Sequence, residues 1–167
     1  MTPPAAHWRP MQPQDLPQVN AIADVVHEAY PEDPAVVTER LALFPLGCRV
    51  AESASGPIGY AVAHPWRLVP PPLDSMLVAL PEQIECLYLH DVALLPATRG
   101  ARLGEALVSY LQDLARQIAA PRLALTAVYE TPHYWSRFGF TPYRTPAIAE
   151  KLASYSETAT FMVRAVD

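Results

Sequence analysis

Apolar side chains repeat along the chain with two different periods, and the changes of period mark the elements. In 12–30 and 101–119 they recur every three or four residues, which is typical of one face of a helix. Shorter, largely apolar runs bounded by Pro, Gly and Ser indicate strands. The two stripes are Leu16, Val19, Ile22, Ala23, Val26 and Ala29, and Leu103, Leu107, Tyr110, Leu111, Leu114 and Ile118. We predict helices at 12–30, 35–44, 101–119 and 131–138, and strands at 7–11, 48–53, 57–66, 85–95, 121–129 and 157–166, with one further strand after the turn at 139–144.

This order of elements predicts a mixed sheet with helices on its faces. The strand–helix–strand unit at 85–128 requires a parallel pair, whereas the hairpin-like strands pair antiparallel. The fold class is therefore α/β (α+β), with a mostly antiparallel central sheet of about six or seven strands and about four helices. No internal repeat or linker occurs, so we expect a single domain over 1–167.

The connection at 67–84 is unusually long for a compact fold and contains three consecutive prolines. Segments of this kind often cover a functional site. We predict one helical turn within it, beginning at Asp74.

Composition narrows the class of partner. The 167 residues carry a net charge of −5, no apolar run is long enough to span a membrane, and the first ten residues lack the apolar core of a signal peptide. We therefore expect a soluble, cytoplasmic protein that binds neither membrane nor nucleic acid, because nucleic acid favours basic surfaces. A cationic small molecule or peptide fits the acidic balance. The sequence defines no oligomeric state, although a homodimer is the commonest closed assembly.

The two cysteines, Cys48 and Cys86, lie in no metal-binding or redox pattern. We expect two reduced thiols in or near the core, and no metal site.

The turn "LLPATRGARLGEAL" places two arginines and two glycines where a strand meets a helix. Helix N-termini bind anions through unpaired N–H groups. Gly100 and Gly104 would let a ligand approach the backbone, while Arg99 and Arg102 add charge suited to a pyrophosphate. Neither GxxxxGK[ST] nor GxGxxG occurs. The alternative is a tight turn with solvated arginines.

The same turn resembles the acyl-CoA-binding motif of the GNAT N-acetyltransferases, [QR]-x-x-G-x-[GA]. Arg99 fills the first position and Gly104 the sixth, but Arg102 replaces the usual glycine at the fourth. "HYWSRFGF" resembles a second signature of this family, and the order of elements matches over nearly the whole chain. The residues that carry the second signature are Tyr134, Trp135, Gly139 and Phe140.

The resemblance implies a GNAT-like fold in which acetyl-CoA, the acyl-donor substrate, lies between splayed strands at 85–95 and 122–128. It implies transfer of an acetyl group to a primary amine of a small molecule or peptide, by direct attack in a ternary complex. Backbone groups near Val92 and Leu94 would hold the pantetheine arm, with the Leu94 N–H as oxyanion donor, and Trp135 would form part of the wall. The pyrophosphate would contact Arg99, Gly100, Ala101, Arg102, Leu103 and Gly104.

Such a reaction benefits from a base, because deprotonating an alkylamine of pKa about 10.4 at pH 7 costs about 4.6 kcal/mol. By strict alternation, Tyr88 and His90 share a face with Val92 and Leu94, and Asp91 points the other way. Arylalkylamine acetyltransferases, in the same superfamily, have two histidines at the places of Tyr88 and His90. His90 is our candidate base, directly or through water; the alternatives are a core role for His90, or Glu85 as base.

Many family members supply a tyrosine as general acid where this chain has Trp135. Expelling a thiolate unprotonated at pH 7 costs only about 2 kcal/mol, if a cysteine-like pKa is taken. We favour no dedicated acid, with Tyr134 as the alternative; both aromatic residues could instead simply pack the core.

The resemblance places the acceptor pocket between the loop after the first helix and the strand before the acyl-CoA strand. Candidate substrate-binding residues there are Tyr30, Glu32, Trp66 and Tyr88, near the acidic loop residues Asp33 and Asp74 and near His64. Aromatic rings and carboxylates suit an amine cation, although a solvated acidic loop is the simpler interpretation. Two other functions stay open: a sensor that binds acyl-CoA without turnover, and a structural α/β domain without cofactor. An O-acyl acceptor or a longer acyl group also stays open.

Overall fold

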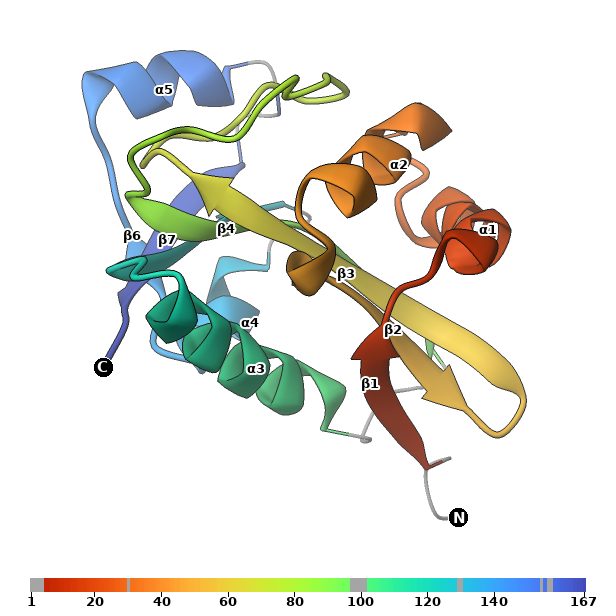
Figure 1. The fold of residues 1–167 in the computed structure, drawn as a ribbon. Coiled ribbons are helices and arrows are strands. Elements are labelled where there is room, and N and C mark those ends of the chain that lie inside the picture. The colour runs from red at the N-terminus through yellow and green to blue at the C-terminus, as the bar shows by residue number, and fades with distance from the viewer. Residues whose placement is uncertain (1–4, 30, 97–101, 129–130, 154, 156–157) are drawn as a thin grey trace.

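The computed structural model describes residues 5–29, 31–96, 102–128, 131–153, 155 and 158–167. Seven strands form one mixed sheet with the spatial order β1-β2-β3-β4-β5-β7-β6 (Figure 1). The strands are β1 (Ala6–Pro10), β2 (Cys48–Ser53), β3 (Gly56–Trp66), β4 (Cys86–Leu94), β5 (Arg122–Ala127), β6 (Thr141–Pro142) and β7 (Thr160–Ala165). The helices are α1 (Leu16–Val26), α2 (Pro34–Leu43), α3 (Leu103–Gln117), α4 (Pro132–Ser136) and α5 (Pro146–Leu152), with short 3₁₀ turns at Pro13–Asp15 and Pro45–Gly47.

The sheet lies between two layers of helices (Figure 1). On one face, α3 and α4 pack onto apolar residues of β3, β4 and β5. On the other face, α1 and α2 cover β2 and β3, and α5 covers the region where β4, β5 and β7 meet. The mixed sheet predicted from the sequence is confirmed, and both helical stripes face the sheet as their spacing indicated.

The C-terminal third differs from the sequence prediction. The strand expected after 139–144 is reduced to the two residues of β6, and the helix α5 follows it. The start of α5 has a sequence signature that we did not use: the Thr145 side chain accepts a hydrogen bond from the Ile148 N–H, and Pro146 occupies the first helical position. The helical turn predicted at Asp74 is absent; the described residues 67–85 form turns, bends and irregular chain.

β4 and β5 form the parallel pair predicted by the strand–helix–strand unit, but they pair over a short stretch. The paired residues run from Leu87 to Leu89 and from Leu123 to Leu125. Both strands continue beyond these positions, to Leu94 and Ala127, without pairing to each other. The two strands therefore part in the middle of the sheet, as the expected splay requires.

A β-bulge in β4 coincides with this parting. Val62 of β3 pairs with Asp91, and the next residue, Ala63, pairs with Leu89, so His90 is the extra residue. A bulge disrupts the ladder and redirects the side chains around it. It therefore determines where the polar residues of β4 point.

Both cysteines are buried and unpaired, as expected. Burial raises the pKa of each thiol to about 12, so both stay protonated at neutral pH.

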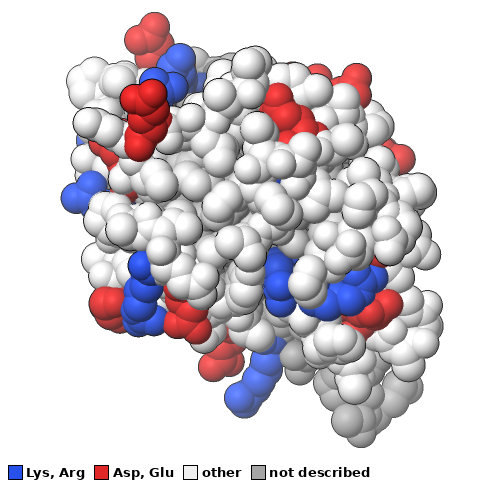
Figure 2. Space-filling view, viewed as in Figure 1, with Lys and Arg blue, Asp and Glu red and all other residues white. Residues whose placement is uncertain are grey.

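On the face shown in Figure 2, Lys and Arg atoms lie in small groups beside Asp and Glu and form no continuous basic stripe. Among the described segments, no helix combines the length and apolarity needed to cross a membrane.

Candidate active site

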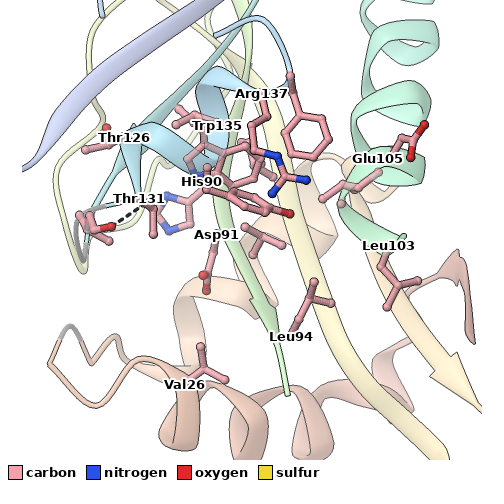
Figure 3. Close-up of a pocket in the computed structure, with 18 of the residues that line it drawn as sticks. Val26, His90, Asp91, Leu94, Leu103, Glu105, Thr126, Thr131, Trp135 and Arg137 are labelled. Carbon is pink, nitrogen blue, oxygen red and sulfur yellow. Dashed lines mark hydrogen bonds between the residues drawn. The ribbon is translucent and has the colours of Figure 1, made fainter. Parts of the chain in front are cut away.

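A cavity of about 1040 Å³ opens where β4 and β5 part (Figure 3). Its walls come from β4, β5, the first turn of α3, α4 and the end of α1. It brings together most of the site residues predicted from the sequence: His90, Val92, Leu94, Arg102, Leu103, Gly104, Tyr134 and Trp135. The predicted residues Tyr30, Arg99, Gly100 and Ala101 lie outside the described part of the chain.

The N-terminus of α3 forms one end of this cavity, where Leu103 and Glu105 project from the helix (Figure 3). Arg102, at the N-cap, has a left-handed backbone with φ of 57°. Glycine adopts this conformation freely, whereas a residue with a Cβ does so at a cost of about 1 kcal/mol. The GNAT motif has glycine at this position, so the departure at Arg102 changes the side chain while the backbone keeps a glycine-like conformation.

Gly104 lies directly beneath the hydroxyl of Tyr134. A Cβ built at position 104 would overlap the Tyr134 hydroxyl oxygen. The first turn of α3 and the α4 aromatic residues are therefore in contact at this end of the cavity. Because its hydroxyl is partly buried, the pKa of Tyr134 is raised above that of a free phenol.

Trp135 serves both the cavity and the core. Its ring is 8% exposed, packs edge-on against Tyr134 with centroids 5.0 Å apart, and contacts Phe140 at 5.9 Å. It also lines the cavity. Trp135 can therefore be a core residue and part of the cavity wall at the same time. Its indole N–H cannot replace the phenol of a tyrosine as a general acid.

The bulge corrects the predicted orientation of side chains on β4. Tyr88 packs under α5, whereas Val92 packs on the α3 side, so these two residues do not share a face. His90 and Asp91, which strict alternation would separate, both contact the segment that follows α1. The prediction failed because alternation assumes an uninterrupted ladder, and His90 interrupts it.

His90 forms a hydrogen-bonded pair with Glu32. Its Nε2 lies 3.0 Å from Glu32 Oε1, while Glu32 Oε2 accepts the Asp74 N–H at 3.0 Å. Burial is the largest single effect on Glu32 and opposes its ionisation. The hydrogen bond and charge of His90, the hydrogen bond from the Asp74 N–H and the charge of Arg40 together outweigh burial and lower the pKa of the carboxyl. An ionised carboxylate only accepts hydrogen bonds, so the Nε2 of His90 carries the proton.

It follows that Nδ1 holds the lone pair when His90 is neutral. Nδ1 is buried, and no partner for it lies among the described residues. Both oxygens of Glu32 are occupied, so the structure places this carboxylate as the partner of His90 rather than as an open anionic group.

Comparison with known proteins agrees with this geometry. The family model described as "Acetyltransferase (GNAT) family" matches residues 16–140. The chain belongs to the GNAT acetyltransferase family. No curated protein gives a significant sequence match.

Solved structures share the fold at low identity. Ard1 from Thermoplasma volcanium is 17% identical, with a TM-score of 0.73, and the alignment covers 98% of this chain and 99% of that one. Arabidopsis thaliana Naa50, in complex with the bisubstrate analogue CoA-Ac-MVNAL, is 12% identical (TM-score 0.71; 96% and 99% covered). N-acetylglutamate synthase from Neisseria gonorrhoeae, complexed with coenzyme A and N-acetyl-glutamate, is 15% identical (TM-score 0.74), and 97% of this chain matches 35% of that chain.

Two predicted acceptor residues lie behind the wall of this GNAT cavity. Trp66 is 7% exposed and Tyr88 is 1% exposed, and both belong to the cluster under α5. The Tyr88 hydroxyl lies 2.7 Å from Thr126 Oγ1, and Thr126 lines the cavity. The alternative base, Glu85, accepts the Leu68 N–H at 3.2 Å and does not line the cavity.

Several cavity residues were not singled out from the sequence, namely Val26, His27, Asp91, Thr126, Thr131 and Arg137. His27 is the C-cap of α1 and lies three residues before the "YPEDP" break, a position that could have drawn attention to it. Its Nε2 lies 2.6 Å from Asp91 Oδ1. Burial is the largest single effect on His27 and opposes its protonation. The hydrogen bond and charge of Asp91, the backbone hydrogen bond with Val92 and the charge of Glu32 together outweigh burial and raise the pKa of His27. Within the described residues, no group of three His, Cys, Asp or Glu side chains is placed to hold a metal ion.

His64, near His90, is a neutral imidazole. The ring centroids are 6.0 Å apart, and His64 is fully buried. Its Nδ1 lies 3.0 Å from Pro65 O, so Nδ1 carries the proton and donates it. Burial lowers the pKa of His64 to about 3.

We expect His64 to make the folded protein less stable in mild acid. The unfolded chain binds a proton with a pKa near 6.5 while the folded protein does not, so this contribution to stability is present above pH 6.5 and is lost as the pH falls toward 3. Between pH 7 and pH 5 the loss is about 2 kcal/mol. Denaturant titrations of wild type and His64→Leu at both pH values measure it. The stability difference between the two pH values should shrink by this amount in the variant; an unchanged difference would show that His64 titrates normally.

Proposed function

We propose that this protein is an acyl-CoA-dependent N-acyltransferase that moves an acetyl group from acetyl-CoA to a primary amine. The observation that carries the proposal is one cavity with a helix N-terminus at one end and, in its wall, His90, which is hydrogen-bonded to Glu32 behind it. Membership of the GNAT family supports it. So do the coenzyme A and bisubstrate complexes of proteins with the same fold.

The cofactor would lie along the parting of β4 and β5. Unpaired N–H groups at the start of α3 suit a pyrophosphate, with Arg102, Leu103 and Gly104 nearest among the described residues. Backbone groups at Val92 and Leu94 would take the pantetheine arm. In this arrangement the Leu94 N–H would stabilise the oxyanion, a contribution typically worth about 3–4 kcal/mol.

His90 would act as the base through Nδ1. The acceptor ammonium loses one proton to solvent, and its nitrogen attacks the thioester carbonyl carbon to give a tetrahedral oxyanion. The attacking nitrogen then gives its second proton to Nδ1, the carbonyl reforms, and the C–S bond breaks to release the thiolate of coenzyme A. Glu32 holds the proton-bearing Nε2 and stabilises the imidazolium that forms. The acceptor would be a small-molecule or peptide amine, with Glu32 at the edge of its pocket through the pairing with His90. Trp66 and Tyr88 are buried behind the cavity wall, so they would support the pocket through packing and would not contact the amine.

No acid is needed for the leaving group in this scheme. We expect Trp135→Tyr to change kcat by less than about threefold, since an unprotonated thiolate costs only about 2 kcal/mol to expel. Steady-state thiol release measures the effect, with Trp135→Phe as the matched control that removes the indole without adding a hydroxyl. A gain of tenfold or more in Trp135→Tyr alone would instead favour the second candidate, an acyl-CoA sensor that lacks an acid.

The function itself is tested by titrating the purified protein with acetyl-CoA in a calorimeter and then following free thiol with a panel of amines. Micromolar binding with amine-dependent thiol release would establish the transferase and begin to define its acceptor. Binding without release for any amine would favour the sensor. Absence of binding would remove the cofactor site altogether.

A further inference from the structure

We propose that Tyr60, Asp91 and His27 form a positioning network that fixes the β4 bulge and thereby aims His90 into the cavity. This inference rests on the proposed function, because it assigns the network a role through the base of that reaction. None of the three residues is proposed to touch the reacting atoms.

The network joins three elements at one carboxylate. From β3, the Tyr60 hydroxyl donates to Asp91 Oδ2 at 2.5 Å. From the end of α1, His27 Nε2 lies 2.6 Å from Asp91 Oδ1. The side chains of Asp91 and His27 are 13% and 18% exposed, and Tyr60 is fully buried. Both carboxylate oxygens are therefore held, from two directions.

The burial of Tyr60 shows that its hydroxyl has a specific role. The ring packs in an apolar cluster with Val50, Val62 and Ala93, where phenylalanine would fill almost the same volume. A buried hydroxyl is costly unless it is hydrogen-bonded. Burial and the neighbouring Asp91 charge raise the pKa of Tyr60, so the phenol stays protonated and donates to the carboxylate.

Asp91 in turn selects the bulged form of β4. Without the extra residue, regular alternation would turn Asp91 toward the face where Leu89 and Val92 pack against α3. A carboxylate there would lose both its partners and its favourable environment. The bonds from Tyr60 and His27 are available only in the bulged register, so they favour it.

The bulge places His90 next to Asp91, which Tyr60 and His27 hold in place. His90 pairs with Glu32 and Asp91 pairs with His27, so two consecutive residues of β4 are tied to the same short segment after α1. Two ties prevent the strand and the segment from rotating about a single contact. They hold the imidazole of His90 in the orientation that leaves Nδ1 as the free base.

Two conservative variants and their combination test the network. We expect Asp91→Asn to lower kcat tenfold or more and Tyr60→Phe to lower it about three- to tenfold, with the KM for acetyl-CoA within twofold of wild type. The double variant should be no slower than Asp91→Asn, because both changes release the same carboxylate. Tyr110→Phe is the matched control: it removes a hydroxyl that donates to Leu46 O at 2.7 Å, away from the cavity, and should leave kcat unchanged.

A second readout does not require turnover. The ring-nitrogen NMR signals of His90 should report an Nε2–H tautomer in wild type and should shift or broaden in Asp91→Asn and Tyr60→Phe, but not in Tyr110→Phe. If wild type turns over and both variants keep its kcat and its His90 signals, the inference is wrong. If wild type shows no transfer to any amine while the His90 signals still move in the variants, the proposed function fails and the positioning network stands. Loss of the folded state in Asp91→Asn, seen by circular dichroism, would leave the milder Tyr60→Phe to decide between these outcomes.

Discussion

Replacing His90 with glutamine should lower kcat about a hundredfold or more while leaving acetyl-CoA binding within threefold of wild type. General base catalysis typically contributes 10²–10⁴ in rate, and glutamine keeps a side chain of similar reach without a basic lone pair. The proposed cofactor contacts lie on the backbone of β4 and at α3, so they survive the change. Steady-state kinetics measure kcat, and calorimetric titration with acetyl-CoA measures binding.

Two companion variants make the result specific. Glu32→Gln keeps the imidazole and removes the charge that holds it, so an intermediate loss of about tenfold is expected, by analogy with other partners of catalytic histidines. His7→Gln alters an exposed histidine on β1 and should have no effect. If His90→Gln keeps the wild-type kcat, His90 is a core residue and the base lies elsewhere.

Gly104→Val should raise the dissociation constant for acetyl-CoA tenfold or more, equivalent to about 1.4 kcal/mol. A side chain at this position would stand between the first turn of α3 and any bound pyrophosphate, and its Cβ would also displace the Tyr134 hydroxyl. Ordinarily, replacing a helical glycine by alanine stabilises the helix by about 1 kcal/mol. Here we expect even Gly104→Ala to weaken binding. Calorimetric titration with acetyl-CoA measures the change.

The double variant Gly104→Ala with Tyr134→Phe separates the two causes. Once the hydroxyl is removed, the nearest remaining atoms would lie 3.4 and 3.5 Å from the added Cβ, which is ordinary contact. If glycine serves the phosphate, binding by the double variant should remain weaker than that by Tyr134→Phe alone. Recovery to the Tyr134→Phe value would show that Gly104 only accommodates the tyrosine, and the pyrophosphate would have to bind elsewhere.

Most of the fold follows from hydrophobic periodicity. The stripes of α1 and α3 and the apolar runs of β3, β4 and β5 are long enough to identify their elements, and the strand–helix–strand unit gives the parallel pair. The helix α5 was missed because seven residues carry too little periodicity. The only sequence signal for this helix is its N-terminal cap, Thr145 followed by Pro146.

The candidate site also has a part that the sequence predicts and a part that it does not. Sequence motifs led to the α3 turn and to the aromatic pair of α4, because each motif is local. The direction of His90 could not be obtained, since it depends on a bulge that is stabilised by residues far away in sequence. Glu32 lies 58 residues from His90, and Tyr60 lies 31 residues from Asp91. Strict alternation gave the wrong face for this reason, and His27 was overlooked because a lone histidine at a helix end has no local signature.

The short β4–β5 pairing has a mechanical consequence. The strands β1 to β4 form one antiparallel group and β5, β7 and β6 form another. Among the described residues, the two groups pair through Leu87–Leu89 of β4 and Leu123–Leu125 of β5 alone. The cavity lies along the unjoined part of this seam. A molecule bound there would bridge the two halves of the sheet, which are otherwise held together by these residue pairs, by α3 and by the packing of α5 over β4, β5 and β7. Binding in the cleft would then raise the free energy of unfolding, because the bound molecule holds the two halves of the sheet together.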